Sequence, residues 1–258
     1  MSMSEETKDG FWETVKTVFW ALLIAGFIRT LFFQPFWIPS SSMKPTLLIG
    51  DFLFVNKMAY GYTEHSCPFS MCPFIDGRWL PRDPERGDVA VFKNPLTQVD
   101  FIKRVVGLPG DTIQMVDGQV LLNGVTLEQT VVDPFVEIKE RQGPLGGIPR
   151  CQNSAGMGAE CVKERSIEVL PEGKSYEVLN IVDNYVTDNT GVFTIPEDTF
   201  FFIGDNRDNS GDSRTPQLGL VPGEMLIGRA DRVIFSAAGQ RILFFWTWRS
   251  DRFFVGLN

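Results

Sequence analysis

Histidine is almost missing from this chain: His65 is the only one among 258 residues. A metal site built from several histidines is therefore excluded, and a Ser-His-Asp triad would have to use this single imidazole. Positive charge is also scarce, since 24 Lys and Arg stand against 32 Asp and Glu and give a net charge of −8. Nucleic-acid affinity depends largely on clustered Lys and Arg, so a nucleic-acid partner is not expected.

Low-complexity sequence is absent as well. The 24 Gly and 16 Pro follow no repeating triplet, which excludes a collagen-like chain. With 43% hydrophobic residues, the chain has enough apolar surface to exclude a disordered protein. The composition therefore indicates a globular body, formed of one or two parts.

Long apolar runs are limited to one. Residues 17–38 carry a single charge, Arg29, and as a helix they would be long enough to cross a hydrocarbon core of about 30 Å. We therefore expect one transmembrane helix over 17–38, after a tail formed by 1–16. Its end would carry an aromatic belt of Phe32, Phe33, Phe36 and Trp37. A buried amphipathic helix is the alternative, whereas the acidic tail and the lack of a small-x-small site disfavour a cleaved signal peptide.

Beyond residue 38, short apolar runs alternate with Gly, Pro and Asp. Runs such as DFLFVNKMAY, GDVAVFKNP and TFFFIGDN are rich in Val, Ile and Phe, which favours strands over helices. The expected fold class is mainly β, with an antiparallel β-sheet body formed by 39–111 and 196–258. Residues 112–195 are more polar and richer in turns, so we interpret them as a smaller, inserted β-rich domain.

The four cysteines form two local pairs, Cys67 with Cys72 and Cys151 with Cys161. Close pairs that follow a membrane span suggest two small disulfides in an oxidising compartment. A zinc site made of all four cysteines is a competing interpretation, although the spacings differ from the tight two-residue knuckles that zinc sites favour. A third interpretation is that the cysteines are free, buried thiols.

Three consecutive serines, at positions 40–42, lie between Pro39 and Pro45. Both prolines disfavour helix for the residue before them, so the serines are expected on an extended, exposed turn. Serine-rich turns are common, and this one taken alone indicates a linker.

A lysine interrupts the apolar strand predicted around residues 100–106. Alternation along that strand places Lys103 on the same face as Phe101 and Val105. Burial against apolar side chains disfavours an ammonium group and lowers a lysine pKa, which turns the amine into a usable general base. A lysine that snorkels from an edge strand is the alternative.

The segment GDNRDNSGDSR, residues 204–214, follows the apolar run TFFFI. Its simplest interpretation is a turn rich in Asx residues and ion pairs. A calcium loop is disfavoured, because Gln217 stands where the bidentate Glu belongs and because Arg207 and Arg214 would put positive charge in the cage. We expect no metal and no cofactor.

Four motifs in this order, behind an apolar helix, resemble the sequence boxes of bacterial type I signal peptidases, the Ser-Lys dyad family. These motifs are PSSSMKPTLLIGDFLFVNKMAYG, RGDVAVF, DFIKRVVGLPGD and GDNRDNSGDSR, within residues 36–112 and 200–235. The resemblance implies a membrane-bound serine endopeptidase that removes signal peptides from secreted preproteins after small residues at −1 and −3. It also implies a single-pass protein of the bacterial inner membrane, with a cytoplasmic tail and a periplasmic catalytic domain, and the lipid bilayer as a partner.

The resemblance assigns roles to individual residues. Ser42 would be the nucleophile, Lys103 its general base, Ser40 a donor in the oxyanion hole and Ser210 the group that orients the lysine amine. Supporting charged residues would be Arg104, Asp205, Arg207, Asp212 and Arg214. Shallow apolar pockets for the substrate would be lined by Phe36, Ile38, Met43, Leu47, Leu53, Phe101 and Ile102.

Two other functions compete with this one. Ser41-Ser42-Met43-Lys44 also fits the S-x-x-K motif of penicillin-binding enzymes, with Ser41 as nucleophile, but that motif needs a helical turn, which Pro45 disfavours, and no K-T-G follows. A membrane-anchored β-rich binding or assembly protein without catalysis is the other alternative. The C-terminal tract ILFFWTWRSDRFF, with arginines at positions 241, 249 and 252, would either dock on lipid headgroups or belong to the core.

Overall fold

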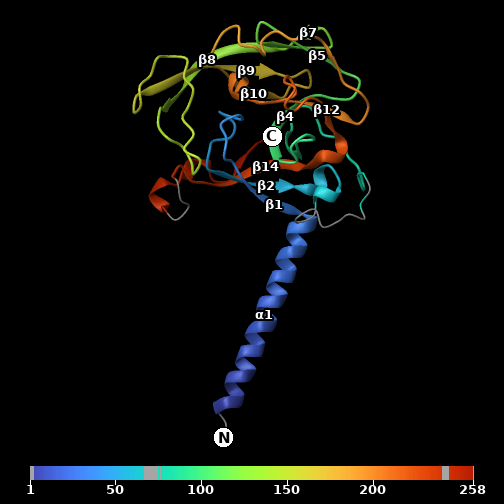
Figure 1. The fold of residues 1–258 in the computed structure, drawn as a ribbon, viewed down its shortest axis with the longest axis vertical. Coiled ribbons are helices and arrows are strands. Elements are labelled where there is room, and N and C mark those ends of the chain that lie inside the picture. Colours follow the sequence, from blue (N-terminus) through green and yellow to red (C-terminus); the bar gives the residue numbers. More distant parts are fainter. Residues whose placement is uncertain (1–2, 67–74, 76, 240–243, 258) are drawn as a thin grey trace.

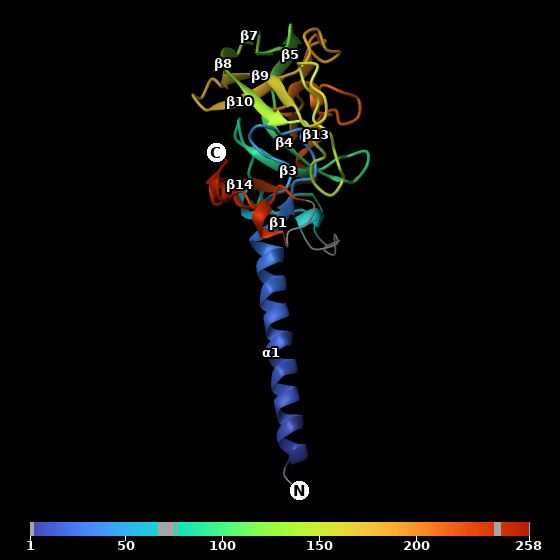
Figure 2. The ribbon, with the colours of Figure 1, turned by 90° about the vertical axis from the view of Figure 1, so that its left-hand side faces the viewer.

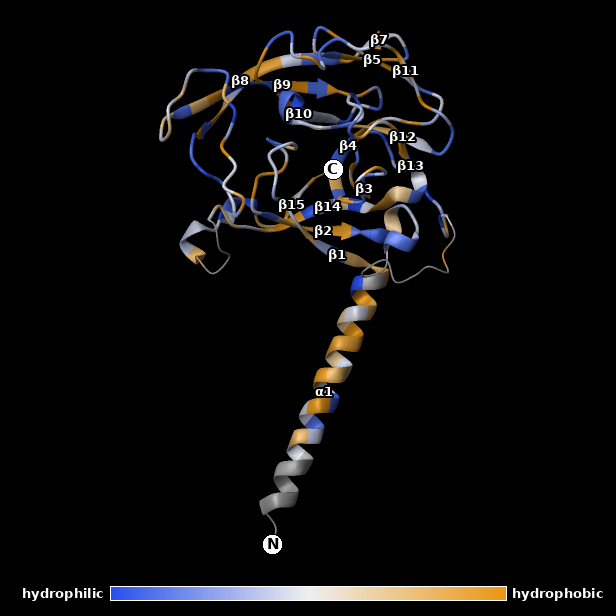
Figure 3. Cartoon of the chain, in the orientation of Figure 1, coloured by the Kyte–Doolittle hydropathy of each residue, from blue (hydrophilic) through white to orange (hydrophobic). Residues whose placement is uncertain are grey.

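A computed structural model describes residues 3–66, 75, 77–239 and 244–257. One long helix, α1 (Met3–Leu31), projects from a β-rich body, as the two views in Figures 1 and 2 show. Within it, Gly10–Arg29 is long and apolar enough to cross a membrane, and none of that stretch is buried in the protein. Figure 3 shows that apolar residues dominate the half of the helix next to the body.

The predicted bounds of this helix, 17–38, were wrong at both ends. The helix begins at Met3 and ends at Leu31, and Phe33–Trp37 forms a strand, β1. Pro35 lacks the backbone N–H that a helix would use and disfavours helix for the residue before it. The strand pairs instead with β2, with Phe33 opposite Asn56 at the start of the register. Three of the four expected belt aromatics therefore lie in a strand of the body.

The main sheet has eight strands in the order β1-β2-β14-β3-β4-β12-β13, with β15 paired to β14. Beyond β1, its strands are β2 (Asp51–Asn56), β3 (Val89–Lys93), β4 (Asp100–Gly107), β12 (Thr199–Ile203), β13 (Val221–Pro222), β14 (Leu226–Ser236) and β15 (Val255–Gly256). Neighbouring strands of this sheet are antiparallel throughout the described residues. The predicted fold class, mainly β with an antiparallel sheet, is confirmed.

Two smaller sheets are formed by the segment between β4 and β12. Their orders are β10-β9-β8 and β11-β5-β6-β7. Their strands are β5 (Thr112–Val116), β6 (Gln119–Leu122), β7 (Val125–Thr126), β8 (Glu128–Ile138), β9 (Glu160–Val169), β10 (Ser175–Asn180) and β11 (Phe193–Thr194). Both sheets lie at the end of the body farthest from α1 (Figures 1 and 2). Ile113 and Val178 share a core cluster with Val106 and Ile203 of the main sheet, so this segment packs directly on the main sheet.

Both faces of the main sheet are covered near its centre. Along β3, Val89 and Val91 belong to one core cluster, whereas Ala90 and Phe92 belong to another on the opposite face. This explains why the strand reads as an unbroken apolar run rather than as an alternating one. The neighbouring strand β4, where Lys103 pairs with Ala90, therefore carries its lysine into a dry environment.

Short 3₁₀ helices connect these strands. They are η1 (Lys57–Ala59), η2 (Glu64–Ser66), η4 (Arg207–Asn209), η5 (Gly223–Met225), η6 (Phe245–Thr247) and η7 (Ser250–Arg252). One of the two predicted disulfides, Cys151–Cys161, is present. Cys67 and Cys72 lie outside the described residues.

The C-terminal segment divides into exposed aromatics and paired arginines. Its exposed aromatic side chains include Phe245, Trp246 and Trp248. Arg249 and Arg252 lie 3.7 and 2.6 Å from oxygens of the buried Asp51, so they bind the body of the protein rather than headgroups. Arg241 lies outside the described residues, and contact of the aromatics with a membrane stays a prediction.

Candidate active site

A serine and a lysine from distant parts of the chain meet inside the body. Ser42 lies on the turn that follows β1, and Lys103 comes from the middle of β4. Lys103 Nζ is 2.6 Å from Ser42 Oγ, which is hydrogen-bonding distance. Both side chains are buried, with 7% of Ser42 and 5% of Lys103 exposed. The serine turn is therefore not the exposed linker that its composition alone suggested.

The surroundings of Lys103 favour the neutral amine. Burial disfavours the ammonium form and lowers the pKa of Lys103 to about 8, while the carboxylates of Asp212 and Asp205 partly offset this effect. The Phe101 ring centre is 5.5 Å from Nζ, a cation–π contact that, like the carboxylates, favours the ammonium form and opposes the effect of burial. A lysine with a pKa near neutrality can accept a proton from a hydroxyl at working pH.

The backbone of the serine turn is held by two asparagines. The Asn206 backbone N–H donates to the Ser42 carbonyl oxygen at 3.0 Å, and Asn206 Nδ2 donates to the Ser41 carbonyl oxygen at 2.9 Å. Asn209 Nδ2 donates to Ser41 Oγ at 2.6 Å. Sequence reasoning assigned no role in the site to either asparagine. Asparagine is so common in turns that its type alone gives no signal.

The two remaining serines assigned a role lie close by. Ser40 Oγ is 3.3 Å from Ser42 Oγ, so its hydroxyl borders the reacting atom. Ser210 Oγ is buried and interacts with the Asp212 carboxyl, whose pKa it helps to lower, and its role in orienting the Lys103 amine stays a prediction. Gly204 permits this crowding, because a Cβ there would lie 2.6 Å from the Ser42 carbonyl oxygen and closer still to Ser210 Oγ.

The charged residues assigned supporting roles are all buried and form ion pairs. Arg104 binds both carboxylate oxygens of Asp205, at 2.8 and 2.7 Å. Arg214 binds both oxygens of Asp212, at 2.9 and 2.8 Å. Arg207 pairs at 2.7 Å with Glu168, a partner from β9 that sequence reasoning missed. Asp212 also accepts the Gly204 N–H. Burial raises the pKa of the Asp212 carboxyl, but the charge of Arg214 and the hydrogen bonds from Arg214 and Gly204 outweigh this effect and leave that pKa below its usual value.

An open cavity of about 590 Å³ lies beside the reacting atoms. Its lining residues are Phe36, Trp37, Ile38, Pro39, Ser40, Ser42, Val91, Val99, Asp100, Phe101, Ile102, Lys103, Asn209 and Gly211. Of the residues predicted to line apolar pockets, Phe36, Ile38, Phe101 and Ile102 do so. The cavity is therefore bounded by β1, the serine turn, β3 and β4.

Three other predicted pocket residues do not line this cavity, and their contact with a substrate stays a prediction. Met43, Leu47 and Leu53 are at most 1% exposed and belong to a core cluster under the sheet. Leu53 occupies an inward position of β2, whose side chains alternate between buried and more exposed sites. Met43 and Leu47 belong to the same cluster, so they anchor the serine turn to the core.

The penicillin-binding alternative does not fit this geometry. It requires the Lys44 amine beside Ser41 Oγ, but Lys44 Nζ is hydrogen-bonded to Glu137 and Gln142. The Ser41 hydroxyl accepts its hydrogen bond from Asn209 instead.

Comparisons with known proteins agree with the motif resemblance. The family model described as "Signal peptidase, peptidase S26" matches residues 11–235. "Signal peptidase I" of Rickettsia typhi is 38% identical over 237 residues, covering 87% of this chain and 81% of that protein. "Signal peptidase I" of Rickettsia akari is 36% identical over 245 residues, covering 90% and 84%.

A crystal structure of a signal peptidase I from Enterococcus faecalis is also similar, at 21% identity and a TM-score of 0.31, covering 57% of this chain and 97% of that one. The family model spans most of the chain, and two relatives share more than a third of their residues with it over nearly all its length. The chain therefore belongs to the signal peptidase family, peptidase S26.

Proposed function

We propose that this protein is a membrane-bound serine endopeptidase whose nucleophile is Ser42 and whose general base is Lys103. The observation that carries the proposal is the 2.6 Å separation of Lys103 Nζ and Ser42 Oγ in a buried site. Family membership supplies the substrate: the enzyme removes signal peptides from preproteins. A β-rich binding protein without catalysis would have no need for a buried amine that is hydrogen-bonded to a serine hydroxyl beside an open cavity.

The chemistry follows from these two groups. A neutral Lys103 takes the proton from Ser42 Oγ, which attacks the carbonyl carbon of the scissile peptide bond. The protonated lysine then gives its proton to the leaving amine, and an ester on Ser42 remains. A water molecule, deprotonated by Lys103, hydrolyses this ester. Ser40 borders the nucleophile and would donate to the oxyanion, and the adjacent apolar cavity would take the small residues at −1 and −3.

The anchoring helix accounts for the position of the site. Only β1 and a short turn lie between the end of α1 and Ser42, so the nucleophile would face a substrate held at the membrane surface. We propose the bacterial inner membrane with the β body on the periplasmic side, the lipid bilayer as a partner, and no nucleic acid. Residues 39–111 and 196–258 would form the catalytic domain, and 112–195 the inserted domain.

The pH dependence of cleavage tests the dyad directly. A base acts only when it is unprotonated, so kcat/KM for a preprotein should rise with pH and level off above the pKa of Lys103, about 8. Below that value it should fall about tenfold per pH unit, to roughly one hundredth of the plateau at pH 6. The measurement is initial cleavage rates of the detergent-solubilised protein over pH 5.5–10. A limb that turns below pH 6.5 would point to His65, whose pKa is lowered from its usual value by burial, and would contradict a lysine base.

Loss of the Ser40 hydroxyl should slow the enzyme without stopping it. We expect Ser40→Ala to lower kcat by about 10²-fold, the usual effect of one oxyanion donor, with KM little changed. Ser41→Ala is the comparison, because the Ser41 hydroxyl faces Asn209 rather than Ser42 Oγ; it weakens the hold on the turn but removes no donor to the oxyanion, so its loss of kcat should be clearly smaller than that of Ser40→Ala. Equal losses in the two variants would show that Ser40 acts on the shape of the turn alone.

A further inference from the structure

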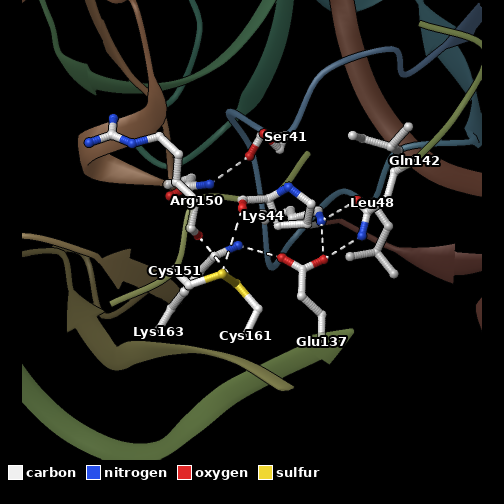
Figure 4. A network of polar contacts seen from close by, with 12 residues as sticks. Ser41, Lys44, Leu48, Glu137, Gln142, Arg150, Cys151, Cys161 and Lys163 are labelled. Atoms are coloured by element: carbon white, nitrogen blue, oxygen red, sulfur yellow. Dashed lines mark hydrogen bonds and ion pairs between the residues drawn. A yellow bond between two sulfur atoms is a disulfide. The ribbon is translucent and has the colours of Figure 1, made fainter. Parts of the chain in front are cut away.

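A second buried lysine lies two residues after the nucleophile. Lys44 is only 2% exposed, and its Nζ is 2.5 Å from Glu137 Oε2 and 2.7 Å from Gln142 Oε1. The other oxygen of Glu137 accepts a hydrogen bond from Lys163, a fully buried residue. Figure 4 shows the Glu137 carboxylate between the two amines. Neither Lys44 nor Glu137 has a place in the chemistry proposed above.

The partners of Lys44 all come from the segment between the two halves of the main sheet. Glu137 is the last residue but one of β8, Lys163 lies in β9, and Gln142 is in the loop that joins these strands. The same loop carries the disulfide, which fastens Cys151 to Cys161 of β9, as Figure 4 also shows. The hairpin formed by β8, β9 and this loop is thus tied directly to the serine turn.

The loop also reaches the second turn that supports the site. Arg150, next to the disulfide, donates from Nη1 to the Asp208 carbonyl oxygen at 2.6 Å. Asp208 directly precedes Asn209, whose side chain holds Ser41 Oγ. The serine turn is therefore held by two sets of contacts. Asn206 and Asn209 bind Ser41 and Ser42, and Glu137 binds Lys44.

We propose that Glu137 and Lys44 are positioning residues that fix the Ser42 turn in register with Lys103, so that the β8–β9 hairpin takes part in assembling the active site. This inference rests on the proposed function of Ser42. Lys44 is separated from Ser42 only by Met43, so a shift of its anchored amine moves the nucleophile. Displacements of about 1 Å at a nucleophile cost on the order of 10²-fold in rate.

The electrostatics explain why the contact is specific. Burial lowers the pKa of Lys44 to about 8, and the charge of Glu137 counteracts that effect. A buried ammonium without its carboxylate is strongly disfavoured, so the Lys44 side chain has one favourable place. A hydrogen-bonded ion pair holds its two side chains at a fixed distance, whereas two apolar side chains in contact can shift relative to each other. The Lys44–Glu137 pair therefore fixes the position of the serine turn.

The test compares two buried lysines on the same carboxylate. Lys44→Met cuts the connection to the serine turn, whereas Lys163→Met removes the partner on the other oxygen and leaves the Lys44–Glu137 contact in place. We expect Lys44→Met to lower kcat about tenfold or more with KM within twofold, and Lys163→Met to keep kcat within twofold. Both should lower the midpoint of thermal unfolding, measured on the full chain in detergent. Lys44→Arg should recover part of the lost kcat.

Three outcomes would overturn the proposal. If Lys44→Met keeps the kcat of the wild type, Lys44 has no positioning role. If Lys44→Met and Lys163→Met lose kcat equally, the network of Glu137 and the two lysines only stabilises the fold. A shift of the acidic limb of the pH profile in Lys44→Met would mean that Lys44 acts through its charge on the dyad. Ser42→Ala, assayed alongside, separates the two hypotheses: if it still processes a preprotein, the proposed function itself fails.

Discussion

Replacement of Ser42 by Ala, or of Lys103 by Met, is expected to reduce cleavage of a preprotein by about 10⁴-fold or more. Ser42→Ala removes the hydroxyl that would form the ester, and Lys103→Met keeps most of the side-chain volume but removes the amine that contacts Ser42 Oγ. Because the two groups act as one unit, the double variant should be no slower than either single variant. Single-turnover cleavage in detergent measures all three.

Two further variants make this expectation specific. Lys103→Arg should remain inactive, because a guanidinium stays protonated at any usable pH and cannot accept the serine proton. Lys57→Met is a matched control: Lys57 is also fully buried with a pKa lowered to about 8 by burial, but it bonds to the Ser66 carbonyl oxygen, away from the site. It should retain cleavage. Normal processing by Lys103→Met, with folding verified, would refute the dyad.

Sequence reasoning correctly predicted the features that depend on the residues of one short segment. The mainly β fold follows from apolar runs of strand length bounded by turn residues, and each run carries its own signal. The burial of Lys103 follows from strand alternation in one segment, and its register opposite Ala90 bears this out. The pairing of Lys103 with Ser42 was implied by family resemblance, since nothing local says that residues 61 positions apart will meet.

The error in the helix bounds came where one pattern fits two structures. The run 17–38 is apolar throughout, and periodicity does not tell a helix from a strand at its end; only Pro35 gave a signal that the helix stops. Met43 and Leu47 lie in a motif associated with substrate pockets, and the structure places them in a core cluster. The Glu137 contact to Lys44 spans 93 positions and has no sequence signature, so only the folded chain reveals it.

Many of the charged side chains near the site are buried inside the protein. Asp205 is 1% exposed, Arg104 is 4% exposed, and the two form a bidentate pair one residue along β4 from Lys103. Arg104 Nη1 also donates to the Gly87 carbonyl oxygen, and its guanidinium lies 4.1 Å from the centre of the Tyr176 ring. This pair joins β4 to the turn after β12, which carries the asparagines that hold Ser42. Stability and site geometry therefore depend on the same carboxylate.

Asp205→Asn should consequently be among the most destabilising substitutions in the protein. It leaves the Arg104 guanidinium buried without a compensating charge, which typically costs about 3–5 kcal/mol. The hydrogen bond that Thr46 Oγ1 donates to Asp205 Oδ2 at 2.5 Å is weakened as well, since a neutral amide oxygen is a poorer acceptor. Urea unfolding of the full chain in detergent measures the change, and cleavage should fall with it because the turn that holds Ser42 begins at this residue.

An exposed ion pair provides the control for this expectation. Glu85 is 72% exposed in its pair with Lys174, at 3.0 Å, so Glu85→Gln removes the same charge from a solvated site. The free energy of unfolding of the Glu85→Gln variant should differ from that of the wild type by less than about 1 kcal/mol, because water solvates the Lys174 ammonium in place of the lost carboxylate. If Asp205→Asn were no more destabilising than Glu85→Gln, the Arg104–Asp205 pair would be dispensable for the fold. The Asn206 backbone N–H would then hold the Ser42 carbonyl oxygen without help from that pair.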